Sequence, residues 1–397
     1  SPTSTESNMK RTRTKRRGGL ARAAEQLVWL ATGLALSGCR AEDRYWENLL
    51  AEAIDTLLDE GDEDTLNDAL DHLYGVDLRA YDELADFIES RAETAAAAAP
   101  EHDILLIAAP VLAWSRYQIP ACSIPQAVLA NLRVHMQAHV LADGVKLALA
   151  DFLFSPDQLP QGYCATSQFA TELGHAALAG ADLRIATDGM PETAHFLSDT
   201  RYLLGAIAVP RGKALFRWQE RDGNRDQSMT QWRTQGGACL APLLPGCALE
   251  VVLPEAYFAA SRQADKASRP YAVRASVAFL GTALDTPAMR LRAVIAPFYD
   301  QELEEFRIGF TTQGSERVVH GVVWPLLGAE DENSDCAAQI ETVLRECGVT
   351  DIVNLDHRFP LEYCDDCGAP MYPSPEGEVV HAEMPEDQGE HVPRHLH

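Results

Sequence analysis

The sequence has none of the glycine-rich loops that hold nucleotide phosphates. Neither Gly-x-x-x-x-Gly-Lys-Ser/Thr nor a Gly-x-Gly-x-x-Gly segment after a strand occurs in it, and the Gly-x-Ser-x-Gly elbow of α/β-hydrolases is missing too. These absences argue against nucleotide-dependent enzymes and against α/β-hydrolases. The motifs that do occur define no particular reaction or substrate.

Basic residues are scarce outside the first 22 positions. The whole chain holds 33 Lys and Arg against 59 Asp and Glu, a formal net charge of −26. Residues 1–22 carry seven basic residues and one acid, so this arm is +6 and the rest of the chain −32. The acidic body repels phosphates, so contact with RNA or DNA would run through the arm, which is too polar to order itself. Its candidate phosphate contacts are Lys10, Arg11, Arg13, Lys15, Arg16 and Arg17.

A hydrophobic run of about 20 residues, which a transmembrane segment requires, is absent. The shorter uncharged run 27–37 leads into Gly38 and Cys39, a pattern typical of a lipoprotein export signal. Residues after Cys39 continue at helical spacing, whereas lipoproteins usually have a loose tether there. We therefore favour an amphipathic helix that ends at Gly38, with a lipid anchor on Cys39 as the alternative. The apolar stripe of this helix comprises Leu20, Ala23, Leu27, Leu30, Ala31 and Leu34.

The cysteines are odd in number, and most of them are scattered in apolar surroundings. This pattern suits buried thiols in a reducing compartment better than a disulfide framework, so we expect a cytoplasmic protein. Whether the native chain starts at Ser1 or at Met9 is open. The cysteines are Cys39, Cys122, Cys164, Cys239, Cys247, Cys336, Cys347, Cys364 and Cys367.

The apolar pattern predicts an α+β protein. A helical region precedes two α/β sandwich-like blocks, in which helices cover mainly one face of each sheet, and a short zinc-knuckle hairpin follows. The predicted parts are a disordered basic arm (1–18), an acidic helical region (19–99), a first α/β block (100–245), a second α/β block (246–356), the hairpin (357–383) and a disordered tail (384–397).

Runs of β-branched and aromatic residues alternate with helical periodicity in both blocks. In the first block we expect strands near 104–109, 145–153, 201–209 and 214–218, and helices near 125–141 and 167–179. In the second block we expect strands near 249–253, 271–279, 291–296, 306–310, 318–324 and 351–355, and helices near 255–266 and 336–347.

Acidic side chains crowd the predicted helical region. Residues 41–98 contain 18 Asp and Glu and three Arg. The simplest interpretation is the solvated outer face of a small helical bundle. The functional alternative is a docking face for a basic protein partner.

The strongest chemical signal is the segment Cys364-Asp-Asp-Cys367-Gly368. Two cysteines at this spacing, followed by a glycine, form a zinc knuckle whose turn directs both thiolates to one ion at about 2.3 Å. A hairpin that turns at 375–377 would bring His381 back to the cysteines. Four protein ligands would make the zinc structural.

The fourth ligand is open. His357 is the first choice because it precedes Cys364 by seven residues, and Cys336, Cys347 or a water follow it. Two other interpretations of the cysteine pair stand beside zinc. A thioredoxin-like redox site would want a helix after Cys367, where the sequence has Gly-Ala-Pro, and a metal-free turn is the other.

An enzyme is the alternative to a binding protein. Its site would lie in a cleft between the two α/β blocks and would use His135, His139 or His175. His135 and His139 have the spacing of two metal ligands on a helix, but the Glu of the metalloprotease motif is missing. Convergence of these histidines with a carboxylate would favour the enzyme.

Several segments carry a family resemblance. They are Met9-Lys-Arg-Thr-Arg-Thr-Lys-Arg-Arg17, Ala41-Glu-Asp-Arg-Tyr-Trp46, Tyr363-Cys-Asp-Asp-Cys-Gly-Ala-Pro370 and Val380-His-Ala-Glu-Met-Pro-Glu386. Together they resemble an uncharacterised bacterial protein family catalogued only as a domain of unknown function, over nearly the whole chain from Met9. The resemblance implies a cytosolic bacterial protein and supplies no activity, ligand or catalytic residue.

The sequence thus favours a non-enzymatic cytosolic accessory protein. We expect a structural zinc site at Cys364, Cys367, His381 and His357, and a basic arm that binds an anionic partner such as RNA or the ribosome.

Overall fold

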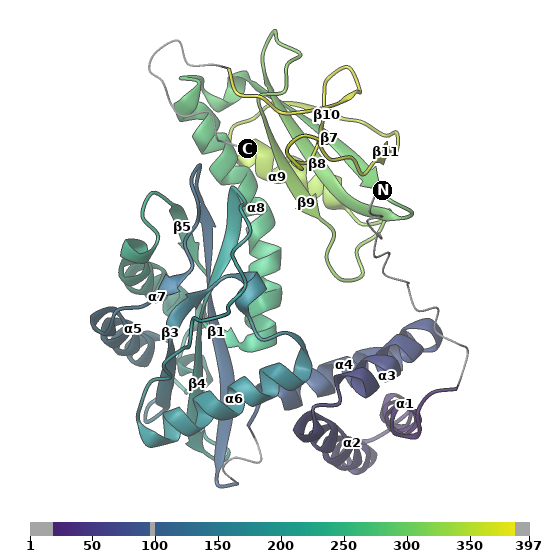
Figure 1. Cartoon of the computed structure of the whole chain (residues 1–397), viewed down its shortest axis with the longest axis vertical. Coiled ribbons are helices and arrows are strands. Elements are labelled where there is room, and N and C mark those ends of the chain that lie inside the picture. Colours follow the sequence, from purple (N-terminus) through teal and green to yellow (C-terminus); the bar gives the residue numbers. More distant parts are fainter. Residues whose placement is uncertain (1–18, 96–99, 386–397) are drawn as a thin grey trace, which may run out of the picture. The chain divides into compact units, whose positions relative to one another are not determined.

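The computed structural model describes residues 19–95 and 100–385 (Figure 1). The chain divides into two compact units. Unit 1 comprises Ser1–Ala92 and Gln161–Ser167, and unit 2 comprises Glu93–Pro160 and Gln168–His397. The predicted basic arm and residues 386–397 of the predicted tail lie outside the described residues.

Helices make up most of unit 1, as the sequence predicts. Leu27, Leu30 and Leu34 are buried on one side of the first helix, which confirms the predicted amphipathic helix. Gly61 ends the second helix with a φ of 72°, a left-handed conformation that favours glycine. The side chain of Asp62 then accepts a hydrogen bond from the Thr65 backbone N–H and caps the third. The helices are α1 (Arg22–Ala35), α2 (Arg40–Glu60), α3 (Glu63–Val76) and α4 (Leu78–Glu93).

The first sheet of unit 2 is antiparallel, with strand order β2-β3-β4-β1-β5, and β6 also pairs with β1. Its centre is the long pairing of β1 with β4, which runs from His102 opposite Pro210 to Trp114 opposite Ser198. The strands are β1 (His102–Trp114), β2 (Cys122–Ser123), β3 (Lys146–Phe154), β4 (Ser198–Pro210), β5 (Ala248–Val251) and β6 (Glu255–Ala256).

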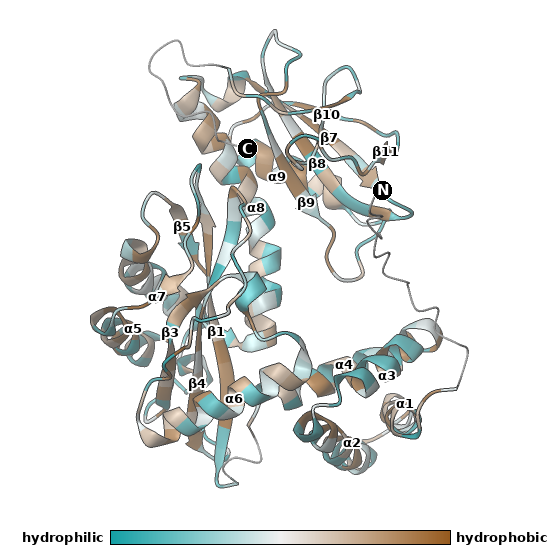
Figure 2. Ribbon diagram, viewed as in Figure 1, coloured by the Kyte–Doolittle hydropathy of each residue, from teal (hydrophilic) through white to brown (hydrophobic). Residues whose placement is uncertain are grey.

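Helices cover both faces of this sheet, not mainly one as expected. Alternate residues of β1 point to opposite faces, so Ile107 packs with α5 and α7 while Leu106 packs with α6 and α8. In Figure 2 the helices α3, α4 and α8 show hydrophilic and apolar residues together, as amphipathic helices do. The four covering helices are α5 (Gln126–His139), α6 (Gly162–Ala179), α7 (Arg225–Leu240) and α8 (Tyr257–Ala283).

Helix α8 packs against both sheets of unit 2. Ala260 and Ala264 pack against the first sheet, and Val273 and Val277 pack against the second. The strand predicted near 271–279 is therefore wrong, because its apolar residues follow a helical stripe. The strand predicted near 249–253 is β5, which pairs with β1 and completes the first sheet.

The second sheet has strand order β10-β7-β8-β9, with β11 beside β7. Its β7–β8–β9 part is antiparallel, and β10 and β11 run parallel to β7. Ile295 and Ile308 face α8 and α9, while Ala296 and Phe298 face a second cluster with Phe359. The elements are β7 (Leu291–Tyr299), β8 (Leu303–Thr312), β9 (His320–Pro325), α9 (Cys336–Glu346), β10 (Asp351–Asn354) and β11 (Phe359–Pro360).

A small hairpin, β12 (Tyr372–Pro373) and β13 (Val379–Val380), ends the described chain. Among the residues that the structure describes, short 3-10 helices connect other elements: η1 (Pro156–Gln158), η2 (Arg217–Gln219), η3 (Ala241–Leu243) and η4 (Ala288–Arg290). The strand predicted near 214–218 is absent: Phe216 forms one isolated bridge with Leu141, and η2 begins next to it. The α+β class is confirmed. Across the described ranges, no helix has the length and apolar character that a membrane crossing requires.

Candidate metal centre

The knuckle is carried on the second sheet by the strand that precedes it. Phe359 of β11 pairs with Phe298 of β7, and their rings stack with centroids 5.4 Å apart. The Leu361 N–H then donates to the Tyr299 carbonyl at 2.9 Å. The chain therefore enters the knuckle from a fixed edge of the sheet.

The knuckle itself is a tight turn closed by backbone hydrogen bonds. The Cys364 N–H donates to the Ala369 carbonyl and the Gly368 N–H donates to the Cys364 carbonyl, both at 2.8 Å. Gly368 has a φ of 71°, the left-handed conformation that the predicted turn requires of this position. Tyr363 and Pro370 form a bridge at its base.

The hairpin returns the chain to the knuckle. Tyr372 pairs with Val380, so His381 follows directly after the last paired residue of β13. The turn at its far end is closed by the Ser374 N–H, which donates to the Glu378 carbonyl at 2.8 Å. Two strands of this length are not stable alone in water. Contacts beyond the hairpin must therefore hold it.

Cys364, Cys367 and His381 form a group that can hold a metal ion. One ligand atom from each residue lies within 4.8 Å of the other two, and the Cys367 Sγ is 3.3 Å from the His381 Nε2. A tetrahedral zinc ion separates such sulfur and nitrogen ligands by about 3.5 to 3.8 Å. The predicted convergence of His381 on the cysteine pair is confirmed. Cys367 is exposed and the other two residues are half-buried.

The turn favours the thiolate form of Cys364. Hydrogen bonds from the Cys367 and Asp366 backbone N–H groups, followed by the Cys367 side chain, lower the pKa of the Cys364 thiol. A thiolate is the form that binds metals. The same backbone turn thus sets the geometry and the charge of this ligand.

Arg307 of β8 fixes both strands at the base of the knuckle. Its Nη1 donates to the Glu362 carbonyl at 2.6 Å and to the Met371 carbonyl at 2.7 Å, and its Nε donates to the Glu305 carboxylate at 2.6 Å. The guanidinium is fully buried, 4.9 Å from the Tyr363 ring centroid. One buried side chain therefore ties the second sheet to the residues on either side of Cys364 and Cys367.

Two glycines of the sheet make room for the hairpin. A Cβ on Gly309 of β8 would lie 2.2 Å from the Pro373 carbonyl oxygen, and one on Gly321 of β9 would lie 2.3 Å from the Tyr372 ring. Burial raises the pKa of Tyr372 to about 12. Neither these glycines nor Arg307 were among the residues predicted to form the site. Glycine inside two successive strands was the available signal, since it often marks a close backbone approach.

The predicted fourth protein ligands lie elsewhere. The His357 ring packs on Phe359, with centroids 4.1 Å apart, and lies beside Gly377 at the far turn of the hairpin. Cys336 is buried on α9, and Cys347 packs into the core between α9 and the second sheet. Within the described residues, none of the three belongs to the metal group.

The three histidines considered for an enzyme do not converge on one site, because His175 lies apart from the other two. His135 and His139 stack on α5, with ring centroids 5.9 Å apart, on one face of the first sheet. His175 is exposed on α6, which covers the opposite face. Burial, then the charges of His135 and Arg217, lowers the pKa of His139.

Fold and site define an α+β protein with a Cys-Cys-His group where the knuckle meets the hairpin that ends the described chain. A family model for proteins of unknown function, DUF2863, matches residues 12–395, and the chain belongs to this family. No curated protein and no solved structure shows significant similarity to the chain.

Proposed function

We propose that the protein is a non-enzymatic accessory protein whose C-terminal hairpin is held in place by zinc. The observation that carries this proposal is the grouping of two thiols and one imidazole within 4.8 Å. Mixed sulfur and nitrogen ligands select zinc over magnesium or calcium, which prefer oxygen. The hydrogen bonds that lower the pKa of Cys364 also suit this role, because they favour the thiolate that binds a metal.

The role of the metal follows from the shortness of the hairpin. Residues 359–381 make only two-residue strands, and the ion would join the knuckle to the end of β13. Because the unfolded chain does not hold these ligands together, zinc binding contributes folding free energy whether its fourth ligand is protein or water. The metal would therefore stabilise the C-terminal layer on the second sheet.

Zinc content of the full chain tests the proposal. We expect one zinc per chain by native mass spectrometry with elemental analysis, and its loss in Cys364→Ser and His381→Gln. Cys347→Ser is the matched control, because this thiol lies outside the group, and it should retain zinc. Metal-free wild-type protein in which Cys364 and Cys367 alkylate at the rate of the unfolded chain would refute the proposal.

A water molecule would complete the coordination. The group has three protein ligands in the described chain, and His357 is occupied by its stacking on Phe359. His357→Gln should therefore leave the zinc content unchanged. Loss of zinc in this variant would make His357 the fourth ligand.

The basic arm supplies the second part of the proposal, binding of an anionic partner such as RNA. Six basic side chains within residues 10–17 support it, and they lie outside the described residues. A labelled single-stranded RNA of 20 nucleotides should bind the full chain with a log–log salt slope of about −4 for six phosphate contacts. Binding should vanish when residues 1–18 are deleted, and salt-independent binding would exclude this role.

A further inference from the structure

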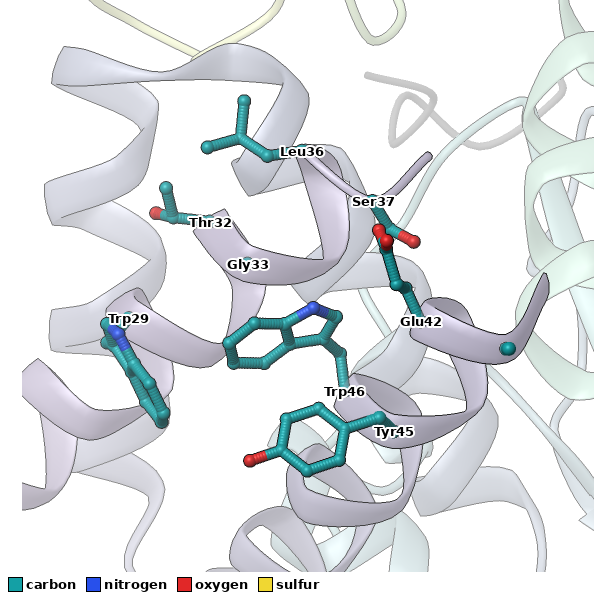
Figure 3. A pocket seen from close by; sticks show the side chains of 9 residues that line it. Trp29, Thr32, Gly33, Leu36, Ser37, Glu42, Tyr45 and Trp46 are labelled. Carbon is teal, nitrogen blue, oxygen red and sulfur yellow. The ribbon is translucent and has the colours of Figure 1, made fainter. Parts of the chain in front are cut away.

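An open groove lies between α1 and α2 of unit 1 (Figure 3). It has a volume of about 640 Å³ and is lined mainly by apolar and aromatic side chains. We call it the α1–α2 groove. Its main residues are Trp29 and Gly33 of α1, Leu36 at the end of α1, and Glu42, Tyr45 and Trp46 of α2.

The groove exposes large apolar side chains to solvent. Leu36 is 77% exposed, and Trp29 and Tyr45 are each 57% exposed. Most apolar side chains of these helices point into the core of unit 1, so these three form a separate surface. Large exposed apolar side chains that line one groove, rather than being scattered singly, are typical of an interaction site.

The floor of the groove is preformed. The Trp46 indole lies flat across the backbone of α1 at Gly33, where a Cβ would be 2.8 Å from the ring (Figure 3). Trp29 and Tyr45 each meet Trp46 edge-on, with ring centroids 5.1 Å apart in both pairs. Interlocked rings lose little side-chain entropy when a ligand binds.

The unit that carries the groove is acidic, and the two arginines next to Glu42 on α2 are Arg40, which pairs with Asp43, and Arg44. Residues 19–92 contain 18 Asp and Glu against five Arg, a net charge of −13. Glu42 lies at the rim, where its carboxylate accepts a hydrogen bond from the Gly38 N–H at 2.9 Å, and exposed Glu25 lies one helical turn before Trp29. This field repels nucleic acid and also a second copy of unit 1, and it attracts a cationic partner.

We propose that the α1–α2 groove binds an amphipathic helical segment of a partner protein that carries Lys and Arg beside its apolar face. Trp29 of α1 and Leu36, the residue that caps the end of α1, are seven residues apart, about 10 Å along the axis, which is the spacing of residues i and i+7 on a bound helix. Its apolar residues contact Leu36, Trp29 and Tyr45. Its basic residues face Glu25 and Glu42 or lie over the exposed aromatic rings.

This inference is independent of the proposed zinc site. Every residue of the groove belongs to unit 1, whereas the metal group belongs to unit 2. Cys364→Ser should abolish zinc binding and leave binding at the groove unchanged. The two proposals can therefore fail separately.

Binding of defined synthetic helices to the full chain tests the inference. The probe is a fluorescein-labelled 18-residue peptide with Leu at i, i+3, i+4 and i+7 and Lys and Arg at the other positions. Fluorescence anisotropy measures its binding. A second peptide keeps the Leu face and replaces Lys and Arg by Glu. We expect the basic peptide to bind at least tenfold more tightly, and equal binding would overturn the inference.

Protein variants locate the binding site. Leu36→Ser is the first choice because a side chain that is 77% exposed is dispensable for folding, and Trp29→Ala is the second. Each should weaken the basic peptide at least tenfold. Tyr74→Ala is the matched control, since Tyr74 is a 67% exposed aromatic residue on α3 of the same unit, and it should have no effect. If all variants bind the peptide with equal affinity, the peptide binds elsewhere and the proposal that it binds in the groove is wrong.

Two further measurements separate other occupants from a partner helix. Deletion of residues 1–18 should leave the peptide affinity unchanged, and a rise of tenfold or more would show that the chain's own arm occupies the groove. Analytical ultracentrifugation should show no self-association through the groove. Self-association through the groove would be recognised by its loss in Leu36→Ser. Such self-association would assign the groove to a second copy and overturn the partner proposal.

Gly33→Ala tests the preformed floor without removing any exposed side chain or charge. The added Cβ must displace the Trp46 indole, because it would lie 2.8 Å from the ring. We expect a loss of peptide affinity of about tenfold with the helical content unchanged by circular dichroism. Full affinity in a folded Gly33→Ala protein would show that Trp46 plays no part in the site.

Discussion

Gly309 of β8 and Gly321 of β9 lie directly opposite each other in the second sheet. Opposed residues of an antiparallel pair present their side chains to the same face, so the two glycines together leave a bare patch of backbone. Tyr372 and Pro373 of the hairpin cover this patch. The proposed metal site therefore depends on the absence of two methyl groups in strands far from it in the sequence.

Alanine at either glycine should loosen the hairpin. The new Cβ would clash with the Pro373 carbonyl in Gly309→Ala and with the Tyr372 ring in Gly321→Ala, and we expect a cost of about 2 kcal/mol for each. If docking and metal binding are coupled, zinc affinity falls about thirtyfold, which a competition titration with a fluorescent chelator measures.

Gly281→Ala of α8 is the control for this pair. Its Cβ would meet no atom closer than 3.6 Å, and alanine is the better helix former, so zinc affinity should be unchanged. Wild-type zinc affinity in both Gly309→Ala and Gly321→Ala would show that the hairpin does not need this patch.

Arg307→Lys should disconnect the knuckle from β8. A lysine cannot reach the Glu362 carbonyl, the Met371 carbonyl and the Glu305 carboxylate at once, as the guanidinium does. We expect a loss of about 3 kcal/mol in the free energy of unfolding, because buried polar partners remain unpaired. Urea titration measures it.

Arg292→Lys is the matched control on the neighbouring strand. Arg292 binds Asp351 at 2.9 Å but is partly exposed, so this change should cost less than about 1 kcal/mol. A similar small effect for Arg307→Lys would mean that Arg307 does not anchor the knuckle.

Metal removal should act locally. After chelation we expect backbone amides of residues 359–383 to exchange faster with deuterium. The short hairpin then loses the proposed metal and keeps its contacts with Arg307 and with the two glycines. Strand β1 should keep its protection, since its hydrogen bonds belong to the first sheet. Unchanged exchange in 359–383 would show that no metal stabilises the hairpin.

The sequence predicts the structure correctly where local chemistry decides it. The turn at Cys364–Gly368 and the return of His381 follow from the spacing of the cysteines, the glycine and the hairpin residues. The prediction was wrong at 271–279, where valines and aromatic residues suggested a strand, because Val273, Val277 and Leu280 form a helical stripe in the second half of α8. Here tertiary packing overrides β propensity.

Long-range contacts could not be predicted. Arg307, Gly309 and Gly321 act on residues 50 or more positions away, and their role follows only from the pairing of β8 with β9 and the docking of the hairpin. The position of β5 beside β1 has the same cause, because no local signal tells which sheet a short strand will join. His357 was proposed as a ligand on sequence distance alone, whereas packing on Phe359 decides its place.

The buried His320 should make unit 2 sensitive to acid. Its ring lies among Trp114, Phe279 and Phe310, and its Nε2 is 2.9 Å from the Ser276 Oγ. Desolvation lowers the pKa of His320 from 6.5 to about 4. The folded state therefore holds a neutral imidazole at pH values where the unfolded chain already binds a proton.

The direction of the pH effect follows from this difference. Well above pH 6.5 neither state is protonated at this position and stability is unaffected. As the pH falls through 6.5 towards about 4, the unfolded state gains the proton and is favoured. Between pH 7 and pH 5 we expect the free energy of unfolding to fall by about 2 kcal/mol from this residue alone.

The measurement is the free energy of unfolding at both pH values for the wild type and for His320→Gln, which cannot titrate. The wild type should lose about 2 kcal/mol more than the variant, while His175→Gln, a change at an exposed histidine, should keep the wild-type difference. If His320→Gln loses as much stability at pH 5 as the wild type, His320 is not the acid-sensitive group.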